Sequence, residues 1–339
     1  MNSVGRFIIP NRFPDCNTWP TVLRIIFMGT PELARAILRA LAASPDFQVA
    51  AVVTQPDRPK GRELKLTPSP VKELALLLGL PVLQPEKARE EAFLEQLRVL
   101  NPDLIAVAAF GQILPKSILD LPPFGCLNVH TSLLPKYRGA APIQWAILND
   151  ELETGVTIMK MDPGLDTGDI LAQQKTPIHA HDNSQTLHDR LAEIGAALLV
   201  RTIREHVAGK LIPTPQPVEG VSYAPKIKKQ DGQLDWRLSA RALWNRVRGL
   251  TPWPGAFTFI GEDPHRRLLK IWQAEVVTAS GPPGEILQAD RIGLIVGCGR
   301  DALRLIALQL EGGRRLDAQQ FLAGHPLKQG QRLESPIQE

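Results

Sequence analysis

Asn128 and His130 are the first residues of this chain whose types and spacing suggest chemistry. They follow a short apolar run and belong to the polar segment Leu127–Pro142. One residue separates them, so on an extended chain their side chains point the same way. An amide that donates to a developing oxyanion, beside an imidazole that handles a proton near neutral pH, is suited to acyl transfer. An isolated Asn-x-His pair, however, is more often a strand-end cap beside a hydrogen-bonded turn histidine.

The segment Asp162–Asp169, with the sequence DPGLDTGD, is the second candidate. It follows an apolar run over Val156–Met161, so we expect a tight acidic loop after a strand. Asp166 on such a loop could orient an imidazole or accept a proton, directly or through water. Asp and Gly are also ordinary turn residues, so the loop by itself leaves a purely structural role open. Its spacing does not match the EF-hand pattern, which argues against calcium.

Both segments lie in residues 23–206, where the sequence predicts a doubly wound, Rossmann-like α/β domain. Near-continuous apolar runs alternate with helical patterns; the runs are Leu23–Met28, Val49–Thr54, Asp103–Ala109 and Cys126–Val129. This alternation is typical of a mostly parallel sheet covered on both faces, which binds ligands at the carboxyl ends of its strands. The last helix is expected to begin with Asp182 as its cap and Gln185 three residues later.

The rest of the chain differs in pattern. Residues 1–22 contain three prolines and no period, so we expect a disordered extension and not a signal peptide. Residues 207–222 carry prolines between Gly209 and Gly220, which predicts a linker. In residues 223–330, short alternating runs separated by glycines favour a small β-barrel of the OB type.

Composition excludes several classes of protein. The 339 residues carry a net charge of +4, which suits an anionic partner without requiring one. No apolar run approaches the ~20 residues that span a bilayer. Three distant cysteines suit a reducing cytosol and give no disulfide framework or zinc spacing, so we expect a cytoplasmic protein without a metal. Phosphate-loop and dinucleotide-binding signatures are absent from the sequence.

The two polar segments together resemble the folate-dependent formyltransferases, in particular the methionyl-tRNA formyltransferase family, which carries an Asn-x-His-x-Ser-Leu-Leu-Pro element and a downstream acidic loop. The likeness runs from about Leu23 to about Pro326. It implies that Asn128, His130 and Asp166 are catalytic, with 10-formyltetrahydrofolate as the formyl donor. It also implies a folate site lined by four consecutive residues, Ser132, Leu133, Leu134 and Pro135.

A basic insertion, Gln55–Pro70, favours the tRNA branch of this family. Its cations outnumber Asp57 and Glu63; they are Arg58, Lys60, Arg62 and Lys65. By composition alone such a run is usually a solvated loop. In the family, however, it resembles the loop that reaches the acceptor stem, with Arg62 at its key arginine. The resemblance therefore implies initiator methionyl-tRNA as the partner and formyl acceptor, with the chain acting as a monomer in translation initiation.

The C-terminal part adds basic residues that suit a surface gripping a nucleic-acid backbone, namely Lys226, Lys228, Lys229, Arg241, Arg246 and Arg248. The tryptophans between and after them, Trp236, Trp244 and Trp253, are expected in the core. Two alternatives stay open. One is a formyltransferase acting on a small amine, against which the insertion and the second domain argue. The other is an inactive tRNA-binding protein, against which Asn128, His130 and Asp166 argue.

Overall fold

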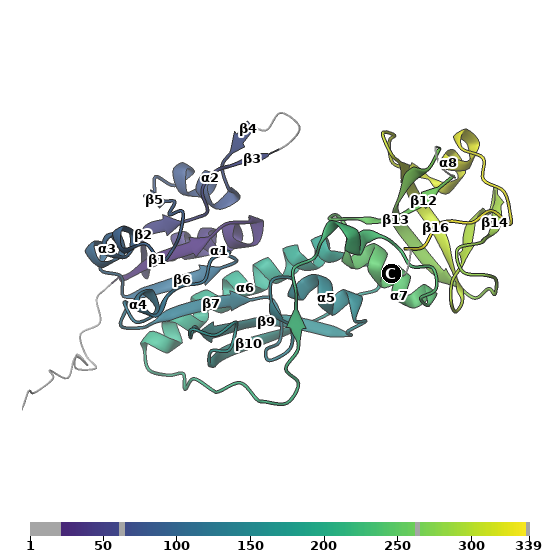
Figure 1. Ribbon diagram of the computed structural model, residues 1–339. Coiled ribbons are helices and arrows are strands. Elements are labelled where there is room, and N and C mark those ends of the chain that lie inside the picture. The colour runs from purple at the N-terminus through teal and green to yellow at the C-terminus, as the bar shows by residue number, and fades with distance from the viewer. Residues whose placement is uncertain (1–21, 61–64, 262–264, 337–339) are drawn as a thin grey trace, which may run out of the picture.

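A computed structural model describes residues 22–60, 65–261 and 265–336. The chain folds around two β-sheets, a mixed sheet in its first part and an antiparallel sheet in its second (Figure 1). The expectation of a mostly parallel α/β sheet followed by a second domain of β-strands is confirmed, and the second sheet is antiparallel; its closure into an OB-type barrel stays a prediction. The predicted extension over residues 1–22 lies outside the described residues, apart from Val22, which directly precedes the first strand.

The first sheet has seven strands in the order β10-β9-β7-β6-β1-β2-β5. Five of them run parallel, and β9 and β10 are antiparallel additions at one edge. Their bounds are β1 Leu23–Gly29, β2 Phe47–Val53, β5 Val82–Leu83, β6 Leu104–Ala108, β7 Cys126–His130, β9 Glu153–Lys160 and β10 Ile170–Pro177. The central strands are buried along their whole length, which is why their sequences are continuously apolar.

Helices cover both faces of this sheet. On one face, Ile25 and Phe27 of β1 pack with four helices, α1 (Glu32–Ala43), α2 (Pro70–Leu77), α5 (Pro142–Leu148) and α6 (Ser184–Val207). On the other, Ile26 and Met28 pack with α3 (Glu91–Leu100) and α4 (Lys116–Leu119). Successive residues of β1 thus enter opposite cores, as the two-residue period of a strand requires.

The start of α6 differs from the prediction by one residue. Asn183, not Asp182, is the cap: its side chain accepts from the backbone N–H groups of Gln185 and Thr186, and Thr186 completes the capping box. Asp182 is instead buried, where it accepts from Arg190 and from the backbone N–H of His179. Burial alone would raise the pKa of Asp182. The hydrogen bonds from Arg190 and His179 outweigh this effect, so the pKa of Asp182 is lowered.

The antiparallel sheet has the strand order β12-β13-β16-β15-β14, with β17 paired to β16. Its strands are β12 Ala256–Ile260, β13 Arg267–Val277, β14 Ile286–Asp290, β15 Gly293–Gly297, β16 Ala302–Leu310 and β17 Leu316–Asp317. The core beneath it holds Trp236 and Phe321 together with α7 (Ala240–Gly249) and α8 (Ala318–Gly324). A 3-10 turn, η1 (Lys229–Gly232), precedes this part.

The two parts of the chain are in contact where α5 packs against α7 (Figure 1). Arg241 of α7 forms an ion pair with Asp150, which follows α5, at 2.7 Å. Arg248 donates to the backbone carbonyls of His179 and Asp182. Because these bonds join segments about 70 to 90 residues apart, α7 is fixed to the first sheet's helices.

Two short pairings stand outside the main sheets. β8 (Arg138–Gly139) pairs in parallel with β11 (Tyr223–Ala224), bringing the polar segment after β7 against the end of the predicted linker. β3 (Arg58–Lys60) and β4 (Lys65–Thr67) pair antiparallel, so the basic insertion begins and ends as a hairpin. The hairpin extends away from the first sheet in Figure 1.

Candidate active site

Asn128, His130 and Asp166 line one cavity of about 480 Å³. Asn128 and His130 lie near the end of β7, where they are 9% and 5% exposed. Asp166 arrives from the acidic loop between β9 and β10. The cavity therefore lies at the carboxyl end of the parallel strands, where α/β sheets bind ligands.

The imidazole of His130 has different surroundings at its two nitrogens. Nε2 lies 2.9 Å from the backbone oxygen of Tyr137. A carbonyl can only accept, so Nε2 carries the proton of this bond. Nδ1 lies 3.7 Å from Asp166 Oδ2, within reach for an ion pair when the ring is protonated but beyond a direct hydrogen bond. Nδ1 is thus the nitrogen that can exchange a proton near the cavity.

The loop that carries Asp166 is shaped by its own short polar residues. Asp162 accepts from the hydroxyl of Thr167 and from the backbone N–H of Gly164. Gly168 fits because a Cβ there would lie 1.8 Å from the backbone oxygen of Lys160. Asp166 itself takes the left-handed conformation, with φ 53°. Its carboxylate then accepts from the backbone N–H of Gly139 at 2.8 Å, which fixes one oxygen beside His130.

The side-chain amide of Asn128 is uncommitted. Among the residues that the structure describes, none forms a hydrogen bond with this amide, although the residue is largely buried. It borders the cavity with His130 and Asp166. Its amide atoms are not among the buried polar atoms that lack a partner, so they reach the cavity and can donate to a substrate oxygen there.

Much of the cavity wall comes from residues that the sequence analysis missed. The segment after β6, residues 109–113, forms one side, and Leu33, Met161 and Leu165 add apolar surface. β6 pairs with β7, so its carboxyl end opens onto the same edge of the sheet. Ligands bind at the carboxyl ends of parallel strands, so the segment after β6 could have been predicted from the sequence in the same way as Asn128.

The four residues that the resemblance assigned to folate form a buried turn beside this cavity and are not part of its lining. The hydroxyl of Ser132 donates to the backbone oxygen of Lys136, and the backbone N–H of Leu134 donates to Thr157. The peptide bond between Leu134 and Pro135 is cis. Leu133 lies against the backbone of Gly155. Their role toward folate stays a prediction, and their contacts here support the segment that carries His130.

Tyr137 provides the backbone carbonyl that accepts the hydrogen bond from His130 Nε2. Its backbone is left-handed, with φ 61°, and its N–H donates to the hydroxyl of Ser222. Its own hydroxyl donates to Glu151 at 2.7 Å. Burial raises the pKa of Tyr137 to about 12, so the phenol stays a neutral donor at physiological pH.

Comparison with known proteins agrees with this geometry. The family model described as formyl transferase matches residues 23–203, and the formyl transferase C-terminal domain matches residues 226–326. The chain is 53% identical to a methionyl-tRNA formyltransferase of Citrifermentans bemidjiense, over 91% of this chain and 96% of that protein. It is 51% identical to the one of Geobacter sulfurreducens, over 92% and 96% of the two chains.

The chain belongs to the methionyl-tRNA formyltransferase family. As a member of this folate-dependent family it is a formyltransferase.

Solved structures share the fold of this formyltransferase. HypX from Aquifex aeolicus, in complex with tetrahydrofolic acid, superposes with a TM-score of 0.57 at 17% identity, over 93% of this chain and 51% of that one. An N-formyltransferase from Helicobacter canadensis, in complex with folinic acid and dTDP-3-aminofucose, gives a TM-score of 0.59 at 17% identity, over 84% and 99%. At this identity the likeness concerns the fold alone.

The basic insertion of the formyltransferase is partly described. Arg58 is exposed on β3, and Lys60 and Lys65 stand at the ends of β3 and β4 that face the tip. Arg62 lies outside the described residues. At the base, Asp57 accepts from Lys72 at 2.6 Å and from Gln84 at 2.8 Å. These bonds tie the insertion to α2 and to the segment after β5.

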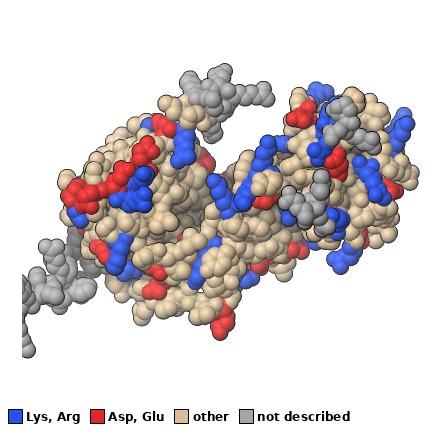
Figure 2. All heavy atoms as spheres, viewed as in Figure 1, with Lys and Arg blue, Asp and Glu red and all other residues tan. Residues whose placement is uncertain are grey.

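The basic residues of the C-terminal part divide into two groups. Lys226, Lys228 and Lys229 are exposed, as contact with a nucleic-acid backbone would require. Arg241 and Arg248 instead join α7 to the first sheet's helices, and Arg246 donates to the backbone oxygen of Asp231. Figure 2 shows Lys and Arg over this part and along the hollow between the two lobes.

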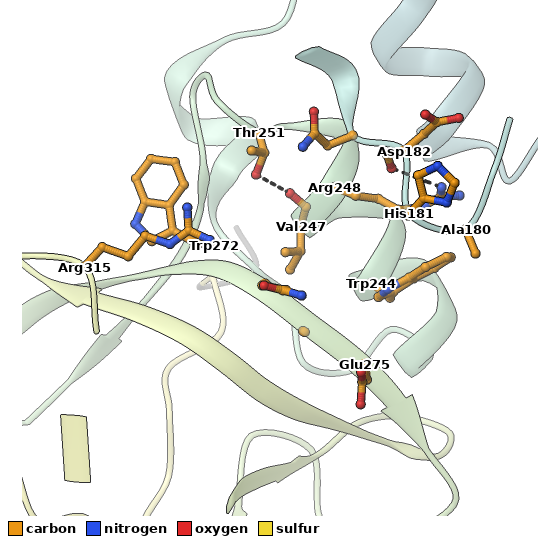
Figure 3. Close-up of a pocket in the computed structure, with 13 residues that line it drawn as sticks. Ala180, His181, Asp182, Trp244, Val247, Arg248, Thr251, Trp272, Glu275 and Arg315 are labelled. Carbon is orange, nitrogen blue, oxygen red and sulfur yellow. Dashed lines mark hydrogen bonds between the residues drawn. The ribbon is translucent and has the colours of Figure 1, made fainter. Parts of the chain in front are cut away.

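The tryptophans also divide. Trp236 is fully buried as expected, but Trp253 is 57% exposed, so the core assignment was wrong for Trp253. Trp244 is half-buried, with the guanidinium groups of Arg241 and Arg248 at 4.4 and 4.0 Å from its ring centre. It borders a second cavity, of about 550 Å³, at the junction of the two sheets (Figure 3). The Trp and Arg side chains of α7 thus lie at the interface between the two parts of the chain, and Trp244 is not simply a core residue.

Within residues 22–60, 65–261 and 265–336, no three His, Cys, Asp or Glu side chains are grouped as a metal ion would need. In the same ranges, none of the helices has both the length and the apolar character that crossing a bilayer demands.

Proposed function

We propose that this chain transfers the formyl group of 10-formyltetrahydrofolate to the amino group of methionyl-initiator-tRNA, giving N-formylmethionyl-tRNA for translation initiation. The observation that carries the proposal is an uncommitted amide, an imidazole and a carboxylate at one cavity. Curated relatives about 50% identical over nine tenths of the chain, all named methionyl-tRNA formyltransferase, support the choice of acceptor.

The first step is attack of the amino nitrogen on the formyl carbon, which turns the formyl oxygen into an oxyanion. Asn128 can donate to this oxyanion because its amide makes no other bond within the described part of the chain. Protonated His130 adds a positive charge beside it. Its Nε2–H stays on the carbonyl of Tyr137, so the ring keeps its orientation while Nδ1 acts.

The second step breaks the bond between the formyl carbon and N10 of the folate. The amine loses one proton as the new C–N bond forms, and N10 gains one as it leaves, so the reaction needs no net proton source. Asp166, 3.7 Å from Nδ1, stabilises the imidazolium and accepts the amine's proton through water. His130 Nδ1 then supplies the proton for N10, and the proton taken up by Asp166 passes to Nδ1 through water, which restores both groups for the next turnover.

The body of the acceptor tRNA is held outside this cavity. In this proposal the cations of the basic insertion, Arg58, Lys60, Arg62 and Lys65, contact the acceptor stem, and Lys226, Lys228 and Lys229 contact the tRNA backbone. Arg and Lys side chains that contact phosphates give an affinity that falls as the salt concentration rises.

The apolar wall at residues 109–113 and Met161 suits the flat pterin of the reduced folate. We expect the chain to act as a cytoplasmic monomer.

The test is a transfer assay with labelled 10-formyltetrahydrofolate and three acceptors: charged initiator tRNA, charged elongator tRNA carrying the same amino acid, and a small amine such as an amino sugar nucleotide. We expect label on the initiator tRNA at the highest kcat/KM. Preferential labelling of the small amine would favour the small-amine alternative, and no labelling of any acceptor would favour the inactive tRNA-binding protein.

A further inference from the structure

The segment predicted as a linker runs along the back of two segments that border the candidate active site, the acidic loop and the residues after β7. After α6 it runs past β10, and Thr214 pairs with Ile170 through two backbone hydrogen bonds of 2.8 and 2.9 Å (Figure 1). Further on, β11 pairs with β8 beside His130's loop. The segment is therefore bound to the acidic loop's end at Ile170 and, through Ser222 and the adjoining β11, to the residues that follow His130, although its composition suggests only a connection.

Between these two anchors, Gln216 uses its whole side-chain amide. Its Oε1 accepts from Arg138 Nε at 3.1 Å and from Arg138 Nη2 at 2.7 Å. Its Nε2 donates to the backbone oxygens of Asp166 and Gly168, both at 2.8 Å. An amide offers two donor hydrogens and one accepting oxygen, so all of this capacity is committed.

These four bonds join the two functional loops. Arg138 belongs to the loop after β7, and its neighbour Gly139 donates to the Asp166 carboxylate at 2.8 Å. Asp166 is in the left-handed region, which a residue other than glycine keeps only when its surroundings hold it there. Gln216 bonds the carbonyl of this residue directly, so it fixes the peptide that aims the carboxylate at His130.

We infer that Gln216 is a positioning residue for formyl transfer: it holds Asp166 in the left-handed conformation that places its carboxylate beside His130. This inference rests on the proposed function. Gln216 does not line the cavity, so it acts on the reaction through Asp166 and Arg138. Small errors in the placement of reacting groups are costly, up to about 100-fold for a shift near 1 Å.

The experiment compares Gln216→Ala and Gln216→Glu with the control Val218→Ala, an exposed position in the same segment. Gln216→Ala should lower kcat roughly 10- to 100-fold while the KM for folate and for tRNA changes little, because the binding surfaces are intact. Gln216→Glu keeps oxygens for Arg138 but has no N–H for the two carbonyls. Its kcat should be as low as that of Gln216→Ala, and the melting temperatures of both variants show whether they are folded under the assay conditions. Val218→Ala should be unchanged.

Three outcomes would overturn the inference: wild-type kcat in Gln216→Ala, recovery of kcat in Gln216→Glu, or a loss that matches the fraction of unfolded protein. A second readout does not depend on turnover. The imidazole NMR signal of His130, assigned by its loss in His130→Ala, should shift in Gln216→Ala and stay in place in Val218→Ala. If the wild-type chain forms no formylated tRNA, the proposed function fails, and this signal still reports whether Gln216 positions the pair.

Discussion

The acidic loop and the basic hairpin are both assigned to function, yet the structure holds them differently. Asp166 is bonded through its carboxylate to Gly139 and through its backbone to Gln216, so two distant segments fix it. The hairpin is tied at its base, through Asp57, while Arg58 beyond this point is exposed on β3. Several bonds thus fix the acidic loop, whereas the bonds of Asp57 tie the hairpin to α2 at its base.

This difference follows from what each segment has to do. Transferring a group between two substrates needs atoms placed to a fraction of an ångström. Binding the phosphates of a large, rigid partner needs exposed positive charge, and the electrostatic interaction energy varies only slowly with the position of each charge. Substitutions should therefore act on kcat in the first region and on tRNA kinetics and salt dependence in the second.

The largest expected effect tests the first region directly. His130→Ala, or Asp166→Asn, should lower kcat about 10²–10⁴-fold with little change in folate affinity, because each removes one partner of the proton-transferring pair. Steady-state kinetics with initiator tRNA and equilibrium folate binding measure the two quantities. Near-normal turnover in either variant would remove that residue from the mechanism.

A second substitution tests whether the bracing itself matters. Gly139 has φ 117°, and a Cβ there would lie 2.9 Å from the backbone oxygen of Ala224. Gly139→Ala should therefore part β8 from β11 and displace the N–H that holds Asp166, lowering kcat roughly 10- to 100-fold. Strain of this kind also costs about 1–3 kcal/mol of stability.

The matched control is Gly220→Ala, in the segment that precedes β11, the partner strand of β8. Gly220 also has a positive φ, 80°, but a Cβ there would meet nothing within 4 Å. Both variants carry backbone strain, and only Gly139→Ala adds a collision in the site. Equal kinetics in the two variants would show that the β8–β11 pairing is unimportant for turnover.

A smaller effect is expected at the hairpin. Arg62→Ala should lower kcat/KM for initiator tRNA about tenfold, leave folate binding intact and make the salt dependence shallower. Arg62→Lys keeps the charge but loses the planar fork, so it separates phosphate neutralisation from recognition of a shaped feature. Lys116→Ala, which removes an exposed cation on α4, serves as the control. An unchanged salt slope in Arg62→Ala would reduce the insertion to a solvated loop.

The comparison also shows how far the sequence could predict the molecule. The parallel sheet and the meeting of Asn128, His130 and Asp166 follow from local patterns, because strand ends gather at one edge of such a sheet. The role of Gln216 could not be predicted, since its contacts lie 48 to 78 residues away and Pro-rich composition indicates only a connection. The cap of α6 was misplaced because Asp182 and Asn183 are both good caps and only tertiary bonds to Asp182 decide between them.

The smallest expected effect lies at the foot of the hairpin. Asp57→Asn keeps an oxygen for Gln84 but loses the charge that holds Lys72. It should lower kcat/KM for initiator tRNA a few-fold at most, because ion pairs near the surface contribute little. It should leave kcat for formyl transfer unchanged, since Asp57 does not line the cavity.

The pH dependence of this variant tests whether Asp57 stays charged. Hydrogen bonds from Lys72 and Gln84 hold the pKa of Asp57 below its ordinary value of 3.8. A carboxylate of this kind stabilises the fold fully above the ordinary value and loses its effect only as the pH falls through the lowered one. Asp57 therefore stays charged between about pH 5 and 8, the range in which an ordinary histidine titrates. The ratio of wild-type to Asp57→Asn kcat/KM should be constant across that range, as steady-state kinetics at several pH values would show. A ratio that varies between pH 5 and 8 would mean that Asp57 changes its charge there and that its bonds with Lys72 and Gln84 do not hold its pKa down.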